Sequence, residues 1–200
     1  MLLNISLIIL GYLCGSISSA VVVCKLMGLA DPRTQGSNNP GATNVLRLHG
    51  KKAAIVTLSG DVIKGFVPVF ITWSMQTPPD WVTALTALAA FSGHLFPVFF
   101  GFRGGKGVAT LIGVLFGMYW LLGIAFILTW LVTAALFRYS SLSALLAAAS
   151  IPVITVWLQP SLPYIAAITI MVLLLFWRHR GNIRNLLAGK EDKIGHKSDI

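Results

Sequence analysis

A glycine-rich stretch that carries two basic side chains is the segment of this sequence best suited to chemistry. Residues 101–107 read Gly-Phe-Arg-Gly-Gly-Lys-Gly and stand between two strongly apolar segments. Glycine lets the backbone take positive φ and turn its N–H groups inward as a nest for an anion. Arg103 and Lys106 add positive charge, and a helix that follows would present its N-terminus to the same anion. These features indicate a phosphate cradle, although a tight basic turn would contain the same residue types.

This stretch is not the P-loop of a nucleotide-hydrolysing enzyme. It is one residue short of the pattern GxxxxGK[ST], and Gly107 stands where the Mg²⁺-binding Ser or Thr belongs. The histidines and carboxylates are also too scattered along the chain to form a metal site by their spacing. We therefore expect neither an ATPase, nor a bound metal, nor any other cofactor.

A second polar stretch, residues 31–47, also has the composition of an oxyanion site. It is dense in small hydrogen-bonding side chains, and Arg33 and Arg47 stand near its two ends. A solvated loop would explain its Gly, Pro and Asn content, but it explains the two guanidinium groups less well. The hydrogen-bonding side chains that could contact the anion are Ser37, Asn39, Thr43 and Asn44.

The elements that hold these stretches are membrane helices. The chain has 200 residues, of which 56% are hydrophobic and only 10% charged, and several apolar runs reach spanning length. Residues 108–137 would form a helix of about 45 Å against a hydrocarbon core of about 30 Å, so we expect a break near the middle. The sequence predicts an all-α, polytopic membrane protein of seven helices in one domain, with spans at about 2–24, 53–75, 81–100, 107–118, 120–137, 142–158 and 163–177.

The second of these spans contains Asp61 and Lys64, which share one helix face at the spacing i, i+3 and can form an ion pair. An ionisable pair inside a span is costly, so it is expected to face protein or a watery cavity. A structural role in positioning the helix and a direct role in the site both remain open.

Charge predicts the orientation. All but Lys64 of the fifteen Lys and Arg fall in residues 25–52, in 103–106, at Arg138 and in 178–197. The positive-inside rule places these regions in the cytoplasm, with the N-terminus outside and residues 178–200 as a cytoplasmic basic tail. The formal charge of +9 then reflects topology and anionic lipid, and we expect no nucleic acid partner.

Taken together, the polar motifs resemble those of the bacterial membrane glycerol-3-phosphate acyltransferases that use acyl-phosphate as donor. The similarity covers nearly the whole chain in order. One departure is Asn38, which stands where that family usually has glycine; Asn tolerates the left-handed conformation better than other non-glycine residues. The matching stretches are Gly36–Asn44 with Arg47, Asp61-x-x-Lys64-Gly65, Gly93-His94 through Thr110, Ser140-Ser141, His179 with Asn182-Ile183, and the downstream Gly189 and Glu191.

The resemblance implies transfer of a fatty acyl group from acyl-phosphate to the 1-hydroxyl of glycerol 3-phosphate, which gives lysophosphatidic acid and phosphate. It implies a multi-pass protein of the bacterial inner membrane whose active site faces the cytoplasm. Its implied partners are membrane lipid and, as a possible partner, a soluble enzyme that makes acyl-phosphate. The residues implied as catalytic are Ser37, Arg47, Lys106, His179 and Asn182. Those implied as substrate-binding are Asn39, Thr43, Asn44, His94, Arg103, Gly104, Gly105, Gly107 and Ser141.

Within these sets, Ser37, Arg47 and Lys106 are expected to bind glycerol 3-phosphate, in a pocket that Thr43 and Asn44 shape. The glycine stretch, with His179 and Asn182, is expected to hold the head of the acyl-phosphate.

Acyl-phosphate is an activated anhydride, so no covalent enzyme intermediate is required. No GxSxG elbow and no His-x₄-Asp pattern is present at His94. We expect catalysis by positioning and anion stabilisation, with a substrate phosphate oxygen taking the hydroxyl proton; a general base at His94 or His179 is the rival mechanism. A small transporter of anions or organophosphates is the alternative function, which the intramembrane Asp61 and Lys64 would suit.

Overall fold

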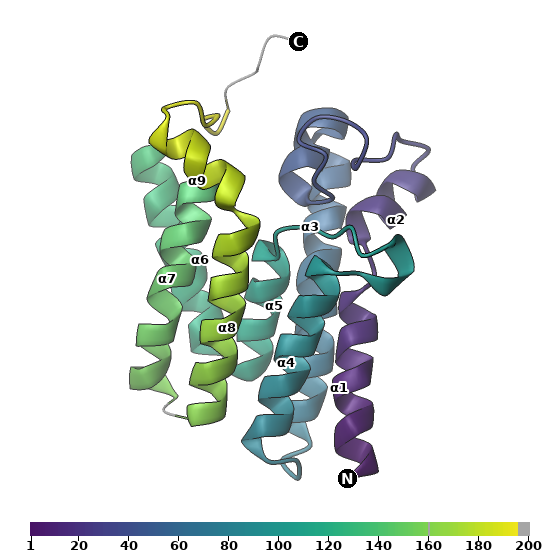
Figure 1. Cartoon of the computed structure of the whole chain (residues 1–200), viewed down its shortest axis with the longest axis vertical. Coiled ribbons are helices and arrows are strands. Elements are labelled where there is room, and N and C mark those ends of the chain that lie inside the picture. The colour runs from purple at the N-terminus through teal and green to yellow at the C-terminus, as the bar shows by residue number, and fades with distance from the viewer. Residues whose placement is uncertain (160, 196–200) are drawn as a thin grey trace.

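The structure, a computed structural model, describes residues 1–159 and 161–195. All of its regular elements in these residues are helices, which run side by side in one bundle (Figure 1). The prediction of an all-α protein is therefore confirmed. The elements are α1 (Leu2–Gly15), α2 (Ser19–Leu26), α3 (Ala42–Ser74), α4 (Asp80–Leu95), the 3-10 helix η1 (Val98–Phe100), α5 (Val108–Met118), α6 (Trp120–Phe137), α7 (Ser140–Leu158), α8 (Leu162–Arg178) and α9 (Arg180–Leu187).

The apolar helices support a multi-pass membrane protein. Within residues 1–159 and 161–195, four segments are long and apolar enough to cross a bilayer by themselves: α3, α4 with the following 3-10 turn, α6 and α7. The pairs α1–α2 and α8–α9, bent by 48° and 59°, raise this number to six if each pair forms one span. The remaining apolar helix, α5, has only 11 residues and extends over about 16 Å.

The first expected span, residues 2–24, is not one continuous helix. The chain leaves the helical conformation after Gly15 and resumes it at Ser19. Gly15 lies so close to α4 that an added Cβ would be 2.0 Å from the carbonyl oxygen of Ala90. The break also provides the carbonyl oxygen of Ile17, which accepts a hydrogen bond of 2.7 Å from the Lys64 ammonium.

The expected ion pair in the second span is present. The Nζ of Lys64 lies 2.8 Å from the Oδ1 of Asp61, and both side chains are buried. The same carboxylate oxygen lies 3.6 Å from the Nδ1 of His94 on α4. The pair therefore joins α3 to the α1–α2 break and stands next to α4.

The break expected within residues 108–137 is also confirmed, since Tyr119 has an extended backbone and separates α5 from α6. Two glycines let α5 approach α3 closely: an added Cβ would lie 2.0 Å from the Val62 carbonyl oxygen at Gly113 and 2.9 Å from the Val69 Cβ at Gly117. Packing against α3 thus fixes a helix that is shorter than the others.

The basic tail has more structure than its composition alone predicts. The helix α9 lies at the same end of the bundle as the α6–α7 turn (Figure 1). Beyond it, the N–H of Ile194 donates to the carbonyl of Arg138 at 2.6 Å, and Lys193 lies over the ring of Tyr139. The chain after α9 therefore reaches back to the α6–α7 turn, while residues 196–200 of the expected tail lie outside the described residues.

Candidate functional site

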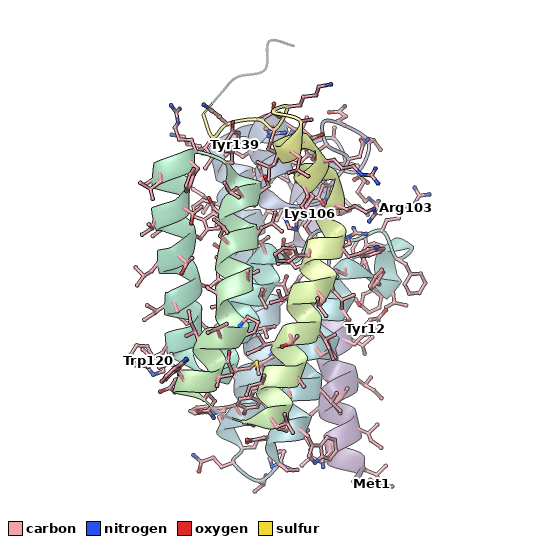
Figure 2. The ribbon with its side chains drawn as sticks, turned by 60° about the vertical axis from the view of Figure 1, so that its left-hand side comes forward. Met1, Tyr12, Arg103, Lys106, Trp120 and Tyr139 are labelled. Atoms are coloured by element: carbon pink, nitrogen blue, oxygen red, sulfur yellow. The ribbon has the colours of Figure 1, made fainter. Side chains whose placement is uncertain are left out.

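A cavity of about 480 Å³ lies among the 37–47 stretch, the end of the glycine stretch, α6, α7 and the α8–α9 region. All but three of the expected site residues line it. Figure 2 shows Lys106 within the bundle and Arg103 at its edge. The expected residues that line the cavity are Ser37, Asn39, Thr43, Asn44, Arg47, His94, Lys106, Gly107, Ser141, His179 and Asn182.

Lys106 stands at one end of a chain of hydrogen bonds. Its Nζ donates to the Oδ1 of Asn182 at 2.7 Å, and the Nδ2 of Asn182 donates to the Oε1 of Glu191 at 2.7 Å. The same oxygen of Glu191 accepts a bond of 2.5 Å from the hydroxyl of Ser141. Glu191 therefore holds the Asn182 amide with its oxygen towards Lys106, a role that nothing in the local sequence indicates.

The ammonium of Lys106 lies in an environment that disfavours its charge. Burial is the largest influence and lowers the pKa of Lys106 below its usual 10.5. The carboxylate of Glu191 acts in the opposite direction, while Arg47 and Arg178 lower the pKa of Lys106 further. A negatively charged ligand in the cavity would offset these effects, so the site is suited to an anion.

The 37–47 stretch is held in shape by Asn44. The buried Asn44 side chain accepts from the N–H of Ser37 at 3.0 Å and donates to the carbonyls of Pro32 and Gln35 at 2.8 and 3.1 Å. Asn38 has φ of 54°, so asparagine does adopt the left-handed conformation where glycine was expected. Asn44 thus fixes the loop that brings Ser37 to the cavity.

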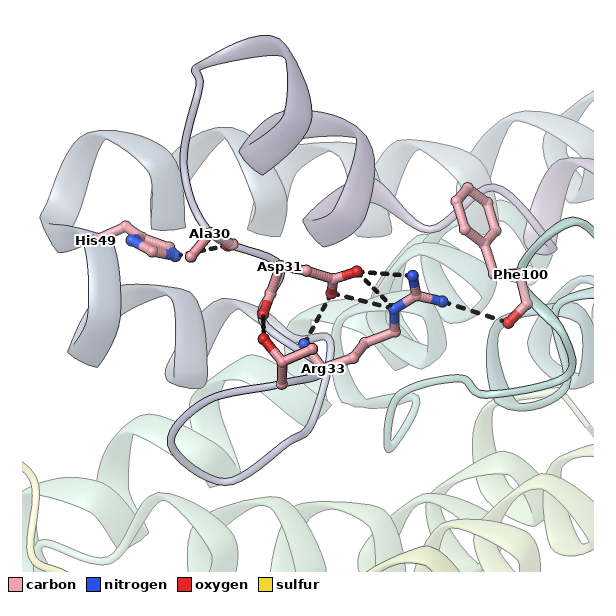
Figure 3. Close-up of polar contacts among 6 residues, drawn as sticks. Ala30, Asp31, Arg33, His49 and Phe100 are labelled. Atoms are coloured by element: carbon pink, nitrogen blue, oxygen red, sulfur yellow. Dashed lines mark hydrogen bonds and ion pairs between the residues drawn. The ribbon is translucent and has the colours of Figure 1, made fainter.

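The two arginines of this stretch have different positions. Arg33 forms a bidentate contact with Asp31, with the closest oxygen at 2.7 Å, and its Nη1 donates to the carbonyl of Phe100 at 3.4 Å (Figure 3). The hydrogen bond from Arg33 to the Asp31 carboxylate holds the pKa of Asp31 below the usual range. Arg33 does not line the cavity, so of the two arginines of this stretch only Arg47 can contact an anion bound there.

Arg47 does line the cavity, and there its partner is an acidic side chain. The Nη2 of Arg47 lies 3.1 Å from the Oδ2 of Asp192, with the two side chains 47% and 50% exposed. Because ion pairs this exposed contribute little stability, an anionic ligand can displace the Asp192 carboxylate from Arg47. Asp192 is a cavity residue that no sequence motif indicates.

The two histidines of the cavity are both buried, at 6% and 3% exposure for His94 and His179. The Nδ1 of His179 lies 2.8 Å from the carbonyl oxygen of Leu175. A carbonyl only accepts, so this nitrogen carries a proton and the Nε2 of a neutral His179 is an acceptor. The carbonyl of His94 accepts from the N–H of Gly105 at 3.2 Å, so His94 also supports the glycine stretch.

Within the glycine stretch, only two of the four glycines have the left-handed conformation. Positive φ occurs at Gly101, Phe102 and Gly107, whereas Gly104 and Gly105 are needed for close packing. An added Cβ would lie 2.0 Å from the His94 carbonyl oxygen at Gly104 and 2.3 Å from the His94 Nε2 at Gly105. Gly104, Gly105 and the exposed Arg103 do not line the cavity.

Replacing Gly104 with alanine is therefore expected to displace the stretch and destabilise the protein by about 1–3 kcal/mol, as overpacking does. The loss should appear as a lower midpoint of thermal unfolding. Gly181→Ala is the matched control, because nothing lies within 4 Å of a Cβ added there. Equal midpoints for the two variants would contradict the packing argument.

Among the residues that the structure describes, no three His, Cys, Asp or Glu side chains are grouped closely enough to hold a metal ion. The cavity instead combines cations and amide groups with an apolar wall. Its apolar lining residues are Leu58, Val108, Ala109, Ile112, Ile127, Trp130, Leu131 and Ala144. Such a site can bind an anionic group and a hydrocarbon chain side by side.

Known proteins resemble this chain over nearly its full length. A family model described as "Glycerol-3-phosphate acyltransferase" matches residues 5–189. The glycerol-3-phosphate acyltransferase of Thioalkalivibrio sulfidiphilus is 54% identical over 198 residues, which cover 99% of this chain and 97% of that protein. The enzyme of the same name from Methylococcus capsulatus is 55% identical over 192 residues, 96% of each chain.

Two solved structures have the same fold. The crystal structure of PlsY, an integral membrane glycerol 3-phosphate acyltransferase, in its glycerol 3-phosphate form has a TM-score of 0.91 and 38% sequence identity, over 96% of each chain. Its lysophosphatidic acid form has a TM-score of 0.89 and 38% identity, over 96% of this chain and 95% of that one.

Proposed function

This chain belongs to the glycerol-3-phosphate acyltransferase family, and from that premise we propose that it acylates the 1-hydroxyl of glycerol 3-phosphate with acyl-phosphate as donor. The products are lysophosphatidic acid and inorganic phosphate. The observation that carries the proposal is the cavity in which Lys106 and Arg47 stand beside an apolar wall. The cations of Lys106 and Arg47 suit the two phosphate groups, and the apolar wall suits the fatty acyl chain.

The phosphate of glycerol 3-phosphate binds at Ser37, Arg47 and Lys106, and it displaces the Asp192 carboxylate from Arg47. The head of the acyl-phosphate binds at Gly107, His179 and Asn182. Two observations support this division. Among the described residues, the Arg47 side chain has only an exposed carboxylate as its partner. His179 and Asn182 come from the α8–α9 region, whereas Ser37 and Arg47 come from the 37–47 stretch. Gly104 and Gly105 act through close packing in the stretch rather than by lining the pocket, and the exposed Arg103 does not line it either.

In the reaction, the 1-hydroxyl oxygen attacks the carbonyl carbon of the acyl-phosphate. The new ester bond forms as the bond between that carbon and the phosphate oxygen breaks, and phosphate leaves with the electron pair. A phosphate oxygen of the substrate takes the hydroxyl proton, so no side chain has to act as the general base. Lys106 and Arg47 stabilise the negative charge that collects on the phosphate groups, and the shared cavity orients the two reactants.

The acyl chain lies along α3, α5 and α6. Leu58 of α3 and Leu131 of α6 line the cavity and are also 45% and 51% exposed. Both residues belong to helices that are apolar enough to cross a bilayer. The cavity therefore opens sideways between α3 and α6. Through this opening the acyl chain of the substrate reaches the lipid without passing through water.

We assign seven spans to the chain: the bent pair α1–α2, α3, α4, the short α5, α6, α7 and α8, with α9 in the cytoplasmic tail. The basic side chains support cytoplasmic placement of the cavity. Apart from Lys64, all Lys and Arg side chains of the described residues lie towards the end of the bundle that holds the C-terminus (Figure 1). They belong to α2, the 27–41 loop, the start of α3, the glycine stretch, the α6–α7 turn and the α8–α9 end. A bacterial inner membrane, with acyl-phosphate supplied by a soluble enzyme, fits this orientation.

The direct test uses purified protein in detergent with glycerol 3-phosphate and palmitoyl-phosphate. Equal amounts of lysophosphatidic acid and inorganic phosphate are expected, with no product from palmitoyl-CoA. Product from the thioester but not from the acyl-phosphate would overturn the donor assignment. Uptake of labelled glycerol 3-phosphate into proteoliposomes, without acylation, would instead establish the transporter.

Replacing Asp192 with asparagine is expected to lower the KM for glycerol 3-phosphate about two- to fivefold and leave kcat unchanged. The reason is that substrate no longer competes with a carboxylate for Arg47, and an exposed pair is worth up to about 1 kcal/mol. Asp192→Glu, which keeps the charge, serves as the control in the same steady-state assay. A higher KM in the asparagine variant would show that Asp192 orients Arg47 for substrate instead.

A further inference from the structure

Arg178, the last residue of α8, holds the glycine stretch from outside the cavity. Its Nε donates to the carbonyl of Gly105 at 3.0 Å, and its Nη2 donates to the carbonyl of Gly104. On the other side of the stretch, the N–H of Gly105 donates to the carbonyl of His94 at 3.2 Å. Arg178 itself does not line the cavity, so its contacts are with the backbone that carries Lys106.

These bonds fix the orientation of two consecutive peptide groups. The peptide between Gly104 and Gly105 is bound at both ends, to Arg178 through its carbonyl and to His94 through its N–H. The next peptide has its carbonyl, that of Gly105, on Arg178. Because the described peptide bonds are trans, its N–H, which belongs to Lys106, points away from Arg178.

The side to which this N–H points matters for anion binding. Lys106 and Gly107 line the cavity, whereas Gly104 and Gly105 do not. A carbonyl turned towards a phosphate would repel it, but an N–H group would bind it. With the carbonyls drawn to Arg178, the Lys106 N–H is on the side of the stretch away from Arg178, and Arg178 does not line the cavity.

We propose that Arg178 is a positioning residue: it turns the carbonyls of Gly104 and Gly105 away from the cavity and directs the Lys106 N–H towards a bound phosphate group. This inference rests on the proposed function only in identifying the anion as a substrate phosphate. Arg178 contacts no substrate itself. It fixes both the backbone donor and the origin of the Lys106 side chain.

The guanidinium group is suited to this role where an ammonium is not. Its rigid, planar fork can donate to two neighbouring carbonyls at once, while lysine is a flexible point charge. The guanidinium carbon of Arg178 also lies 5.7 Å from the ring centroid of Trp177, whose ring is 6.1 Å from that of Phe96. This contact holds the fork in place.

Arg180 provides a matched control. It lies 4.9 Å from the same Trp177 ring, and its Nη1 donates to the carbonyl of Trp177 at 3.2 Å. Its position adds charge and aromatic contact close to Arg178, but it has no bond to the glycine stretch among the described contacts. Substitution of Arg180 therefore reproduces the general effects of losing an arginine here.

The test compares Arg178→Lys with Arg180→Lys in two measurements. Hydrogen exchange of the peptide covering residues 101–107 is expected to become at least about tenfold faster in Arg178→Lys and to stay unchanged in Arg180→Lys. The kcat/KM for acyl transfer should fall at least about tenfold in Arg178→Lys, and less than about twofold in Arg180→Lys. The positive charge is retained in both variants, so a purely electrostatic role predicts wild-type values.

Two outcomes overturn the proposal. Wild-type exchange and activity in Arg178→Lys would mean that only the charge matters. Lost activity with unchanged exchange would mean that Arg178 contacts substrate directly. The exchange measurement needs no substrate, so it stands even if wild-type protein fails to acylate glycerol 3-phosphate.

A measurement on wild-type protein covers the case in which Arg178→Lys does not fold. Saturating inorganic phosphate is expected to slow exchange of the Lys106 amide several-fold, with no change at Gly105, whose N–H is already bonded. Slowing at Gly105 but not at Lys106 would contradict the assigned peptide orientation.

Discussion

Replacing Lys106 with alanine is expected to lower kcat/KM for acyl transfer by about 10³-fold, the largest effect of any substitution considered. The ammonium lies in the cavity and is held by Asn182 at 2.7 Å. In the proposed reaction it binds the phosphate of glycerol 3-phosphate and stabilises the negative charge that collects on the phosphate groups. Loss of one preorganised donor of this kind typically costs 10²–10³-fold in rate, and alanine also removes a full charge. Steady-state rates of phosphate release measure the effect.

Two companion variants sharpen this prediction. His94→Ala should lose much less rate if the substrate phosphate takes the proton, and a loss equal to that of Lys106→Ala would restore His94 as general base. Lys106→Arg tests the charge. Since burial lowers the pKa of Lys106, wild-type activity should decline as pH rises through that pKa, below pH 10.5. In any active arginine variant this decline should move to higher pH, because the guanidinium stays charged.

Replacing Arg47 with alanine is expected to raise the KM for glycerol 3-phosphate by about 10²-fold, with a smaller effect on the KM for acyl-phosphate. Removing one member of a hydrogen-bonded charge pair with a ligand commonly costs 2–5 kcal/mol, and the 47% exposure of the side chain favours the lower part of that range. Arg47→Lys separates charge from the bidentate fork.

Arg33→Ala is the control for this prediction, since Arg33 is bonded to Asp31 and Phe100 and not to the cavity. It should leave both KM values within about twofold of wild type. If Arg47→Ala changed only the KM for acyl-phosphate, the two phosphate positions would have to be exchanged.

Much of the fold could be predicted because membrane helices are specified locally. The apolar run of residues 108–137 is too long for one span, and it breaks at Tyr119 as its length requires. The break at residues 16–18 could not be predicted in this way. It depends on the contact of Gly15 with Ala90 and on the bond from Lys64 to Ile17, and both partners are distant in the sequence.

For the site, most of the residues that the motifs indicated line one cavity, but the separate role of each depends on contacts between motifs. Arg33 and Arg47 are equivalent in the sequence, but Arg33 is bonded to Asp31 and to the Phe100 carbonyl, and only Arg47 lines the cavity. The contribution of Arg178 depends on two backbone carbonyls, which no side-chain pattern can reveal. The glycines of the stretch likewise look like conformational residues, although two of them serve to let His94 approach.

The sideways opening beside Leu58 and Leu131 has a consequence for the choice of fatty acid. A tunnel with a closed end measures the length of a hydrocarbon tail, but a tail that emerges through the flank of the protein meets no end wall. Selection by length would then have to come from the donor pool. A homologous series of acyl-phosphates should be used at similar rates, and the lipids formed should mirror the composition that is supplied.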